Sequence, residues 1–230
     1  MTPTLVLLPG LDGTRFLLQP LLDKLVLDAK VVEYPPTLPS RYEDLLPLVL
    51  DALPTDRDFV LLGWSFSGPL ALMAAATKPK GLRGVVLVGS FIKKPLAWIP
   101  TAARHLARSW LFYPSGLLAR AKTSLSGFGT PSLTNLLVRA HATVPAAVMA
   151  ARVRQVLTVD ASAELCACPT PILYLAGNQD WVVPKRNLAM IQRLRPDVRA
   201  RFIPGPHLAM AVNPAEAAHE LQEFVQQLVE

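Results

Sequence analysis

The chain has little cysteine: two residues in 230, Cys166 and Cys168. They stand two positions apart with no further Cys or His near them at metal-ligand spacing, which argues against a disulfide framework and against a zinc site. A basic region and a cleavage signal are also missing at the N-terminus, where Met1 leads almost directly into an apolar segment. We therefore expect a cytoplasmic protein.

Charge is missing from residues 59–77. A stretch of this length raises the question of a membrane span, which needs about 20 apolar residues. Small and turn-forming residues interrupt it, namely Gly63, Ser65, Ser67, Gly68 and Pro69. A strand, a turn and a helix explain the run better, and we expect no transmembrane segment.

Acidic residues are missing from residues 93–159. This segment carries nine basic residues: Lys93, Lys94, Arg104, Arg108, Arg120, Lys122, Arg139, Arg152 and Arg154. The other 14 of the 23 bases stand against all 17 acids, so the basic character belongs to one segment. Three interpretations stay open: a solvated face without a partner, an anionic protein partner, and an anionic lipid surface. No base-reading motif accompanies the charge, so we expect no nucleic acid.

Short apolar runs alternate with helical patterns along most of the chain. Strands are expected at residues 5–8, 30–34, 59–62, 85–88, 172–176 and 198–203. Helices are expected near residues 17–25, after Ser65 and from about residue 184. A capping box of Ser40 and Glu43 predicts a helix that runs to about residue 53 with a kink at Pro47, and a cap at Asn213 predicts the last helix. This alternation predicts an α/β fold, with a parallel sheet, right-handed crossovers and helices on both faces.

Residues 92–163 break this alternation. The segment is helical in pattern, rich in Ala, Leu and Arg, and interrupted by proline and glycine. We interpret it as a helical cap (lid) inserted over the ends of the strands, with residues 1–91 and 164–230 as the α/β core. Its aromatic residues predict an apolar pocket. They are Trp98, Trp110, Phe112, Tyr113 and Phe128.

The hexapeptide 63–68, Gly-Trp-Ser-Phe-Ser-Gly, joins a predicted strand to a predicted helix. A serine at such a turn, between residues with almost no side chain, is typical of a nucleophile elbow, in which a strained turn exposes the hydroxyl. Ser65 is therefore the candidate nucleophile. The pattern departs from Gly-x-Ser-x-Gly at Ser67, which stands where the second glycine is expected. Ser67 itself and Ser90 are rival nucleophiles, and both have bulkier flanking residues.

A serine hydroxyl needs a general base and a group that orients the base. His207 lies between the last strand and the last helix, at the edge where sites of open α/β sheets form. Asp180 follows the strand 172–176 at the same edge and is the candidate orienting acid, with Asp160 as its nearest rival. The remaining histidines are His105, His141 and His219.

These motifs together resemble the α/β-hydrolase superfamily over nearly the whole chain, because the order Ser65, Asp180, His207 is the order of that superfamily. The resemblance is carried by Leu8 to Gly13, the elbow at Ser65, Gly177 with Asp180 and Pro184, and Gly205-Pro206-His207 followed by Asn213-Pro214. It implies an oxyanion hole from the backbone N–H groups of Leu11 and Phe66. Asp12 and Thr14 either reach this site or form a turn. The first strand matches the oxyanion-loop strand of the superfamily, which implies a minimal, mostly parallel sheet of about six strands.

Within the superfamily, the chain resembles small serine carboxylesterases and is similar to pimeloyl-carrier-protein methyl ester esterases. The resemblance implies hydrolysis of short- to medium-chain carboxylic esters through an acyl-enzyme, with no metal and no cofactor. Trp64 and Trp181 are expected to bind substrate. An alternative substrate is an ester or thioester carried by an acidic acyl carrier protein that docks on the basic cap. Lipases and C–C bond hydrolases share the triad and are further alternatives. A non-catalytic binding module with this fold is an alternative of another class, and Ser67 favours it.

Overall fold

The computed structural model describes residues 2–37, 40–102 and 130–229. Several residues named above lie outside this part of the chain. They are His105, the aromatic residues Trp110, Phe112, Tyr113 and Phe128, and the bases Arg104, Arg108, Arg120 and Lys122.

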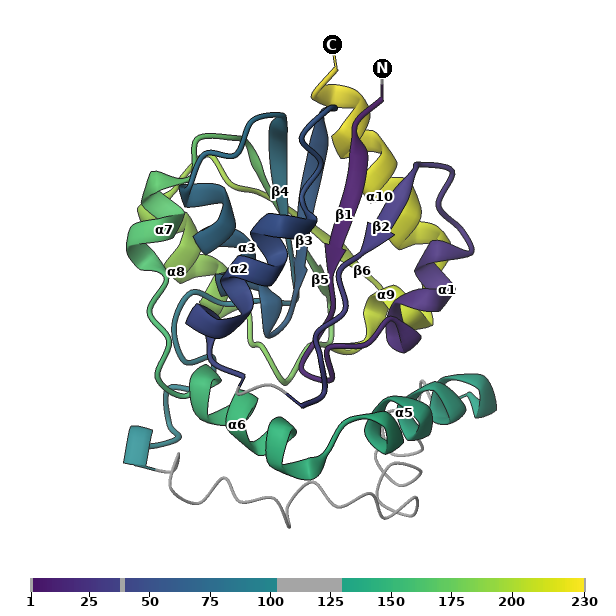
Figure 1. Ribbon diagram of the computed structural model, residues 1–230, viewed down its shortest axis with the longest axis vertical. Coiled ribbons are helices and arrows are strands. Elements are labelled where there is room, and N and C mark those ends of the chain that lie inside the picture. Colours follow the sequence, from purple (N-terminus) through teal and green to yellow (C-terminus); the bar gives the residue numbers. More distant parts are fainter. Residues whose placement is uncertain (1, 38–39, 103–129, 230) are drawn as a thin grey trace.

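A six-stranded sheet forms the centre of the molecule (Figure 1). Its strands are β1 (Thr4–Leu8), β2 (Ala29–Val31), β3 (Phe59–Trp64), β4 (Leu82–Val88), β5 (Ile172–Gly177) and β6 (Arg199–Ile203). They lie in the order β2-β1-β3-β4-β5-β6, and each neighbouring pair is parallel. The predicted α/β fold with about six parallel strands is confirmed.

The strand order places a topological switch between β1 and β3. The chain leaves β1 to one side to form β2 and then crosses to the other side to form β3, so the loops after β1 and β3 diverge. A crevice forms at such a point, outside the carboxyl ends of the strands. The loop that begins at Pro9 and the hexapeptide at Ser65 are the two loops that flank it.

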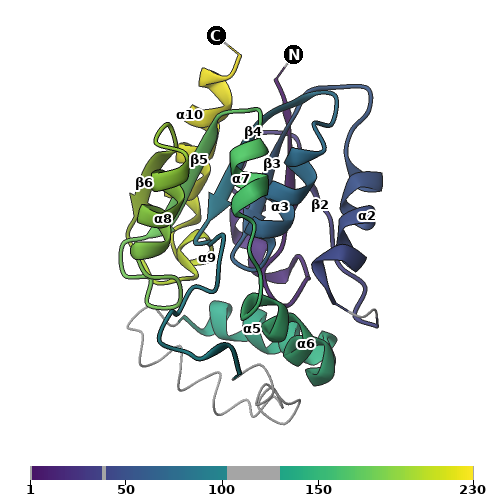
Figure 2. The same ribbon diagram turned by 90° about the vertical axis from the view of Figure 1, so that its left-hand side faces the viewer.

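Two layers of helices cover the two faces of the sheet (Figures 1 and 2). One layer holds α2 (Tyr42–Ala52), α3 (Ser67–Ala76), α7 (Ser162–Ala167) and α8 (Arg186–Leu194). The other holds η1 (Phe16–Leu18), α1 (Gln19–Leu22), α9 (Ala209–Val212) and α10 (Pro214–Gln227). Successive side chains of β1 alternate between the two cores, since Val6 faces the first and Leu7 the second.

The helices α5 (Pro131–Thr143) and α6 (Ala146–Val156) lie across the carboxyl ends of the strands (Figures 1 and 2). Their buried side chains include Leu133 and Ala140 of α5, which join the core on the side of η1. They occupy the place expected for part of a cap, whose limits at residues 92 and 163 stay a prediction. No single described helix is long and apolar enough to cross a membrane; by length and composition alone, α5 and α6 together pass that test as a pair bent by 98°.

One of two predicted helix caps was wrong. Helix α2 begins one residue later than the Ser40 capping box requires: Arg41 is the N-cap, and its backbone N–H and its guanidinium both donate to Asp44. The two hydrogen bonds from the Arg41 guanidinium to the Asp44 carboxylate are charge-assisted and therefore stronger than a bond with a serine hydroxyl, so they set the start of the helix. At α10 the predicted start is confirmed, because Asn213 occupies the N-cap and Pro214 the first turn; the Asn213 side chain does not cap the helix, and its amide donates to the carbonyl of Pro204.

The second core gives a test of how much burial stabilises this fold. Leu221 of α10 is fully buried, so Leu221→Ala leaves a cavity and should lower the free energy of unfolding by about 2–5 kcal/mol. Leu194→Ala removes the same atoms from a side chain that is 42% exposed, and it should cost less than about 1 kcal/mol. Urea unfolding followed by circular dichroism measures both, and equal losses would contradict the assignment of Leu221 to the core.

Candidate active site

Ser65 lies at the turn from β3 to α3 with a positive φ of 52°. Such a backbone conformation is strained for a residue with a side chain and persists where its surroundings hold it. Here the Ser65 N–H donates to the carbonyl of Val88 at 2.8 Å, and the Ser65 carbonyl accepts from the hydroxyl of Ser90 at 2.7 Å. The turn is thus fastened on both sides to the end of β4.

Small residues at positions 63 and 68 allow the strand and the helix to approach each other. A Cβ on Gly63 would lie 2.8 Å from the Cβ of Ala71, and one on Gly68 would lie 2.6 Å from the Cβ of Ser90. Real Cβ atoms are not found at such distances, so any larger residue would push α3 away from the sheet. On the helix side of this elbow, the residue in close contact with Ser90 is therefore Gly68 and not residue 67, which explains why position 67 can carry a side chain.

The hydroxyl of Ser67 joins the elbow to the loop after β1. Ser67 is fully buried, and its Oγ donates to the carbonyl of Pro9. Because this bond uses its only hydrogen, the 2.6 Å contact between Ser67 Oγ and the hydroxyl of Tyr34 has Tyr34 as donor. Burial raises the pKa of Tyr34 far above its ordinary value, so the phenol keeps that proton.

The structure brings Ser65, His207 and Asp180 into contact. His207 Nε2 is 2.8 Å from Ser65 Oγ, and His207 Nδ1 is 2.7 Å from Asp180 Oδ2. The other oxygen of Asp180 accepts from the backbone N–H groups of Val182 at 2.9 Å and Val183 at 2.8 Å. With Nδ1–H donated to the carboxylate, Nε2 is the free acceptor for the serine proton.

The loops that carry Asp180 and His207 are bonded to each other. Asn178 Oδ1 accepts from the N–H of Gly205 at 3.1 Å, and the N–H of Gln179 donates to the Gly205 carbonyl at 3.0 Å. The Asn213 amide fixes the same loop through Pro204. Asp180 and His207 are 27 positions apart in sequence, and these bonds join their loops directly across the edge between β5 and β6.

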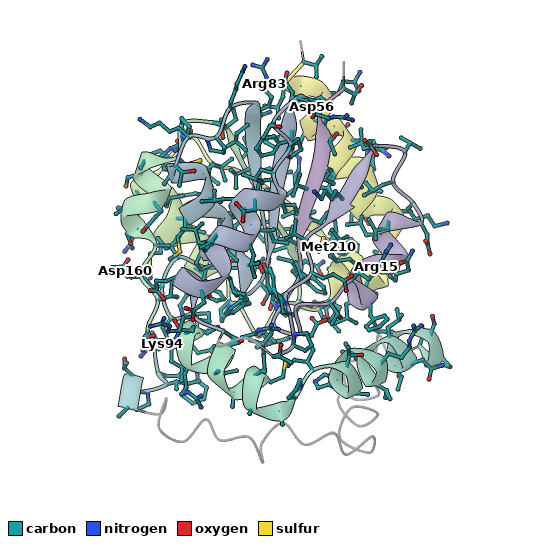
Figure 3. The ribbon with its side chains drawn as sticks, viewed as in Figure 1. Arg15, Asp56, Arg83, Lys94, Asp160 and Met210 are labelled. Carbon is teal, nitrogen blue, oxygen red and sulfur yellow. The ribbon has the colours of Figure 1, made fainter. Side chains whose placement is uncertain are left out.

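The rival candidates lie elsewhere. Asp160 pairs with Lys93, with 3.0 Å between Asp160 Oδ2 and Lys93 Nζ. Figure 3 labels Asp160 at one side of the molecule, well away from Met210 of α9, which follows the His207 loop. His141 Nδ1 contacts the Leu137 carbonyl within α5, and His219 pairs with Glu223 on α10. Ser67 and Ser90 are both buried and bonded to backbone carbonyls, without a histidine partner among the described residues.

The loop after β1 is held at three successive carbonyls. Pro9 accepts from Ser67, Gly10 from the Gly13 N–H at 3.0 Å, and Leu11 from Arg152 Nη1 at 2.8 Å. The C=O and N–H of a trans peptide point in opposite directions, so the bond at Gly10 aims the Leu11 N–H away from the turn. In the part of the chain that the structure describes, the N–H groups of Leu11 and Phe66 donate to no acceptor.

Phe66, the residue after the nucleophile, has its N–H in the peptide whose carbonyl, that of Ser65, accepts from the Ser90 hydroxyl. The carbonyl of Phe66 accepts from the hydroxyl of Tyr42 at 2.9 Å, and the two rings stack with centroids 4.8 Å apart. Asp12 and Thr14 form a turn, since the Asp12 carboxylate accepts from both the N–H and the hydroxyl of Thr14. Burial raises the pKa of Asp12, partly offset by those bonds.

The tryptophans expected at the substrate lie in different environments. Trp64 is buried in the core beneath the elbow, whereas Trp181, next to Asp180, is 86% exposed. Trp98 is also exposed. Among the described residues, no cluster of three or more His, Cys, Asp or Glu side chains could hold a metal ion.

Sequence reasoning missed the residues that brace the site. Tyr34, Tyr42, Ser90 and Arg152 each donate a hydrogen bond that fixes the elbow or the loop after β1. Tyr34 ends a predicted strand and Ser90 follows another, which are the positions where the carboxyl edge of the sheet is built. Tyr42 and Arg152 carry no such signal, because both stand within helices.

In this site a serine lies at the turn from a strand to a helix of a parallel sheet, and a histidine and a buried carboxylate are in line with it. This arrangement defines the class of α/β hydrolases. A family model described as the alpha/beta hydrolase fold matches residues 40–214. The chain belongs to this family.

Relatives and solved structures agree with this family. The biotin biosynthesis bifunctional protein BioHC of Cellvibrio japonicus is 27% identical over 242 residues, covering 98% of this chain and 48% of that protein, so the chain spans about half of that relative. A pimeloyl-[acyl-carrier protein] methyl ester esterase of Yersinia enterocolitica is 26% identical over 205 residues, covering 80% and 75%. A lipase-esterase related protein from Clostridium acetobutylicum has the same fold, with a TM-score of 0.79, 15% identity and coverage of 96% and 94%. The family and these relatives support a hydrolase of the esterase kind.

The contact between Ser67 and Tyr34 gives the second test. Ser67→Ala leaves the Pro9 carbonyl and the Tyr34 hydroxyl without their partner, and it should lower the free energy of unfolding by about 1–3 kcal/mol. Tyr34→Phe should cost less in the Ser67→Ala background than in the wild type, with a coupling of about 0.5–3 kcal/mol. Urea unfolding of the four proteins measures it, with Ser132→Ala, an exposed serine of α5, as control. Additive losses would contradict the shared bond.

Proposed function

We propose that the protein is a serine carboxylesterase that hydrolyses short- to medium-chain carboxylic esters through an acyl-enzyme. One observation carries the proposal: a strained Ser65 with its Oγ 2.8 Å from His207 Nε2, in line with the buried carboxylate of Asp180. A serine hydroxyl becomes a nucleophile when a neutral imidazole can take its proton, and the imidazole needs an acceptor on its other nitrogen to hold that tautomer.

In the first half of the proposed reaction, Ser65 Oγ attacks the ester carbonyl carbon while its proton passes to His207 Nε2. The carbonyl oxygen becomes an oxyanion, which the N–H groups of Leu11 and Phe66 bind. The intermediate collapses, the C–O bond to the alcohol breaks, and His207 returns the proton to the leaving oxygen. In the second half, water attacks the acyl-enzyme, gives its proton to His207, and the acid leaves as Ser65 regains its hydrogen.

Each residue in this scheme has the surroundings that its role requires. Asp180 Oδ1 accepts two backbone N–H bonds, which fix the position of the carboxylate that orients the imidazole. The Leu11 and Phe66 N–H groups share their peptides with the carbonyls of Gly10 and Ser65, which are hydrogen-bonded before substrate arrives, so they need no reorganisation in the transition state. Trp181, exposed beside Asp180, is proposed to contact substrate, and Trp64 beneath the elbow to shape the site from the core side. Residues 92–163 are proposed to be the cap.

The nucleophile can be tested directly. Ser65→Ala should reduce kcat for p-nitrophenyl butyrate by about 10⁴-fold or more, while circular dichroism and thermal unfolding stay as in the wild type. Ser90→Ala is a matched control, because it removes a nearby buried hydroxyl without removing the nucleophile, and it should retain measurable turnover. Retained turnover in Ser65→Ala would overturn the assignment.

A fluorophosphonate probe separates the esterase from a non-catalytic binding module. The wild type should form one covalent adduct on Ser65, and Ser65→Ala should form none. A folded wild-type protein that forms no adduct and hydrolyses no ester would favour the binding module.

A second candidate substrate is an acyl ester carried by an acidic carrier protein. It is favoured by the acid-free segment 93–159, and one of the relatives named above acts on a pimeloyl-[acyl-carrier protein] methyl ester. Within this segment, Arg139 of α5 is exposed near the carboxyl ends of the strands, whereas Lys93 is already paired with Asp160. Exposed bases of this kind steer an acidic partner towards the site.

Charge reversal at Arg139 tests this candidate. Arg139→Glu should raise KM for an acyl-carrier methyl ester by about tenfold and leave KM for p-nitrophenyl butyrate unchanged, because only the carrier carries the complementary charge. The difference should shrink as salt is raised from 50 to 500 mM, values chosen to bracket a Debye length of about 10 Å. An equal change in KM for both substrates would exclude carrier docking at Arg139.

A further inference from the structure

Arg152 of α6 contacts the loop after β1. Its side chain is fully buried, and its Nη1 donates to the carbonyl of Leu11 at 2.8 Å, across 141 residues of sequence. Leu11 supplies one of the two N–H groups proposed to bind the oxyanion. A residue from the segment expected to be the cap thus touches the backbone of the oxyanion loop.

The loop is shaped to receive this guanidinium. Gly13 has a φ of 72°, and a Cβ at that position would lie 3.0 Å from Arg152 Cζ. Any side chain at position 13 would therefore be strained by its backbone and would also displace the guanidinium. On another side the Tyr34 ring lies under it, with Cζ 5.5 Å from the ring centroid, an arrangement in which the ring attracts the cation.

The positive charge of Arg152 is not paired in this arrangement. Among the described residues, Nε and Nη2 have no hydrogen-bond partner, and no carboxylate lies at salt-bridge distance. Asp12 interacts with it electrostatically but makes no hydrogen bond to it, and the Asp12 carboxylate accepts from Thr14 instead. Burial lowers the pKa of the guanidinium, yet an arginine stays protonated in proteins.

A buried and unpaired cation is expensive, and natural proteins retain one where it has a task. At this position the missing counter-charge is an anion, and the proposed reaction creates an anion at the neighbouring N–H group of Leu11. An interaction that is stronger in the transition state than in the ground state accelerates the chemical step without tightening substrate binding.

We propose that Arg152 is a positioning residue of the oxyanion hole: by bonding the Leu11 carbonyl it fixes the peptide that follows Leu11 and so restricts rotation at the residue whose N–H binds the oxyanion, and its unpaired charge is balanced only when that oxyanion forms. This inference rests on the proposed esterase function and adds a residue to its machinery. It differs from a purely structural role, in which Arg152 would only fasten α6 to the core and would matter equally to every ligand.

Two substitutions and a matched control test the proposal with p-nitrophenyl butyrate. Arg152→Met should lower kcat by about 100-fold, the loss typical of one oxyanion-hole element, and change KM by less than about threefold. Arg152→Lys keeps the positive charge but not the planar guanidinium, and its kcat should lie between those of Arg152→Met and the wild type. Arg186→Met removes an exposed guanidinium that also donates to a loop carbonyl, that of Pro95 at 2.9 Å, and should leave kcat within about twofold.

Inhibitor binding separates charge stabilisation from structural support. Butylboronic acid forms a bond from boron to Ser65 Oγ, sends the serine proton to His207, and becomes a tetrahedral anion. The neutral ether p-nitrophenyl butyl ether cannot form such an anion. In Arg152→Met the inhibition constant of the boronic acid should rise in proportion to the loss in kcat, and that of the ether should stay within about threefold.

The outcomes are distinct. An unchanged kcat in Arg152→Met, or equal weakening of boronic acid and ether, overturns the role of Arg152 and leaves the esterase standing, provided that wild type is active and Ser65→Ala is not. A wild type that turns over no ester overturns both. If Arg152→Met does not fold, the same comparison is made in Arg152→Lys, where a lower kcat with unchanged ether binding supports the proposal and unchanged kcat overturns it.

Discussion

The close approach of α3 to β3 and β4 is the constraint on which the rest of the structure depends. It exists because positions 63 and 68 have no Cβ, so that Ala71 and Ser90 can fill the space where side chains would otherwise lie. With the helix this near, Ser65 is forced into a positive φ, and its N–H and carbonyl are fastened to Val88 and Ser90 at the end of β4. The strain at one residue is thus maintained by packing around it.

The same edge of the sheet holds the loop after β1, through contacts that come from two distant parts of the chain and from the loop itself. Ser67 of α3 and Arg152 of α6 each hold one carbonyl, and the turn at Gly13 holds the carbonyl between them. A loop with three successive carbonyls bonded has little freedom, which is what a site must have if its N–H groups are to bind a developing charge without moving. The serine at position 67 is therefore part of the site's framework, since its hydroxyl bonds Pro9 and Tyr34.

Much of the fold and of the candidate triad could be predicted, because both follow from where strands end. Parallel strands bring their carboxyl ends to one edge, so Ser65 after β3, Asp180 after β5 and His207 after β6 were expected near one another, and the structure brings them into contact. The predicted start of α2 was wrong by one residue, because Arg41 and Asp44 form a charged pair that the pattern at Ser40 does not reveal. Arg152 was counted among nine basic residues as part of a charged face, yet its side chain is buried.

The sequence by itself determined the alternation of strands and helices, the order of Ser65, Asp180 and His207, and the small residues of the elbow, since these depend on local pattern and on the edge at which a strand ends. Only the tertiary structure decided between Asp180 and Asp160 as the partner of His207, and between Ser65 and its neighbours Ser67 and Ser90 as the serine that meets the histidine. It alone also joined Arg152 to Leu11, 141 residues away. Hydrogen bonds between segments far apart in sequence depend on distances of a few tenths of an ångström after packing, and no local pattern carries that information.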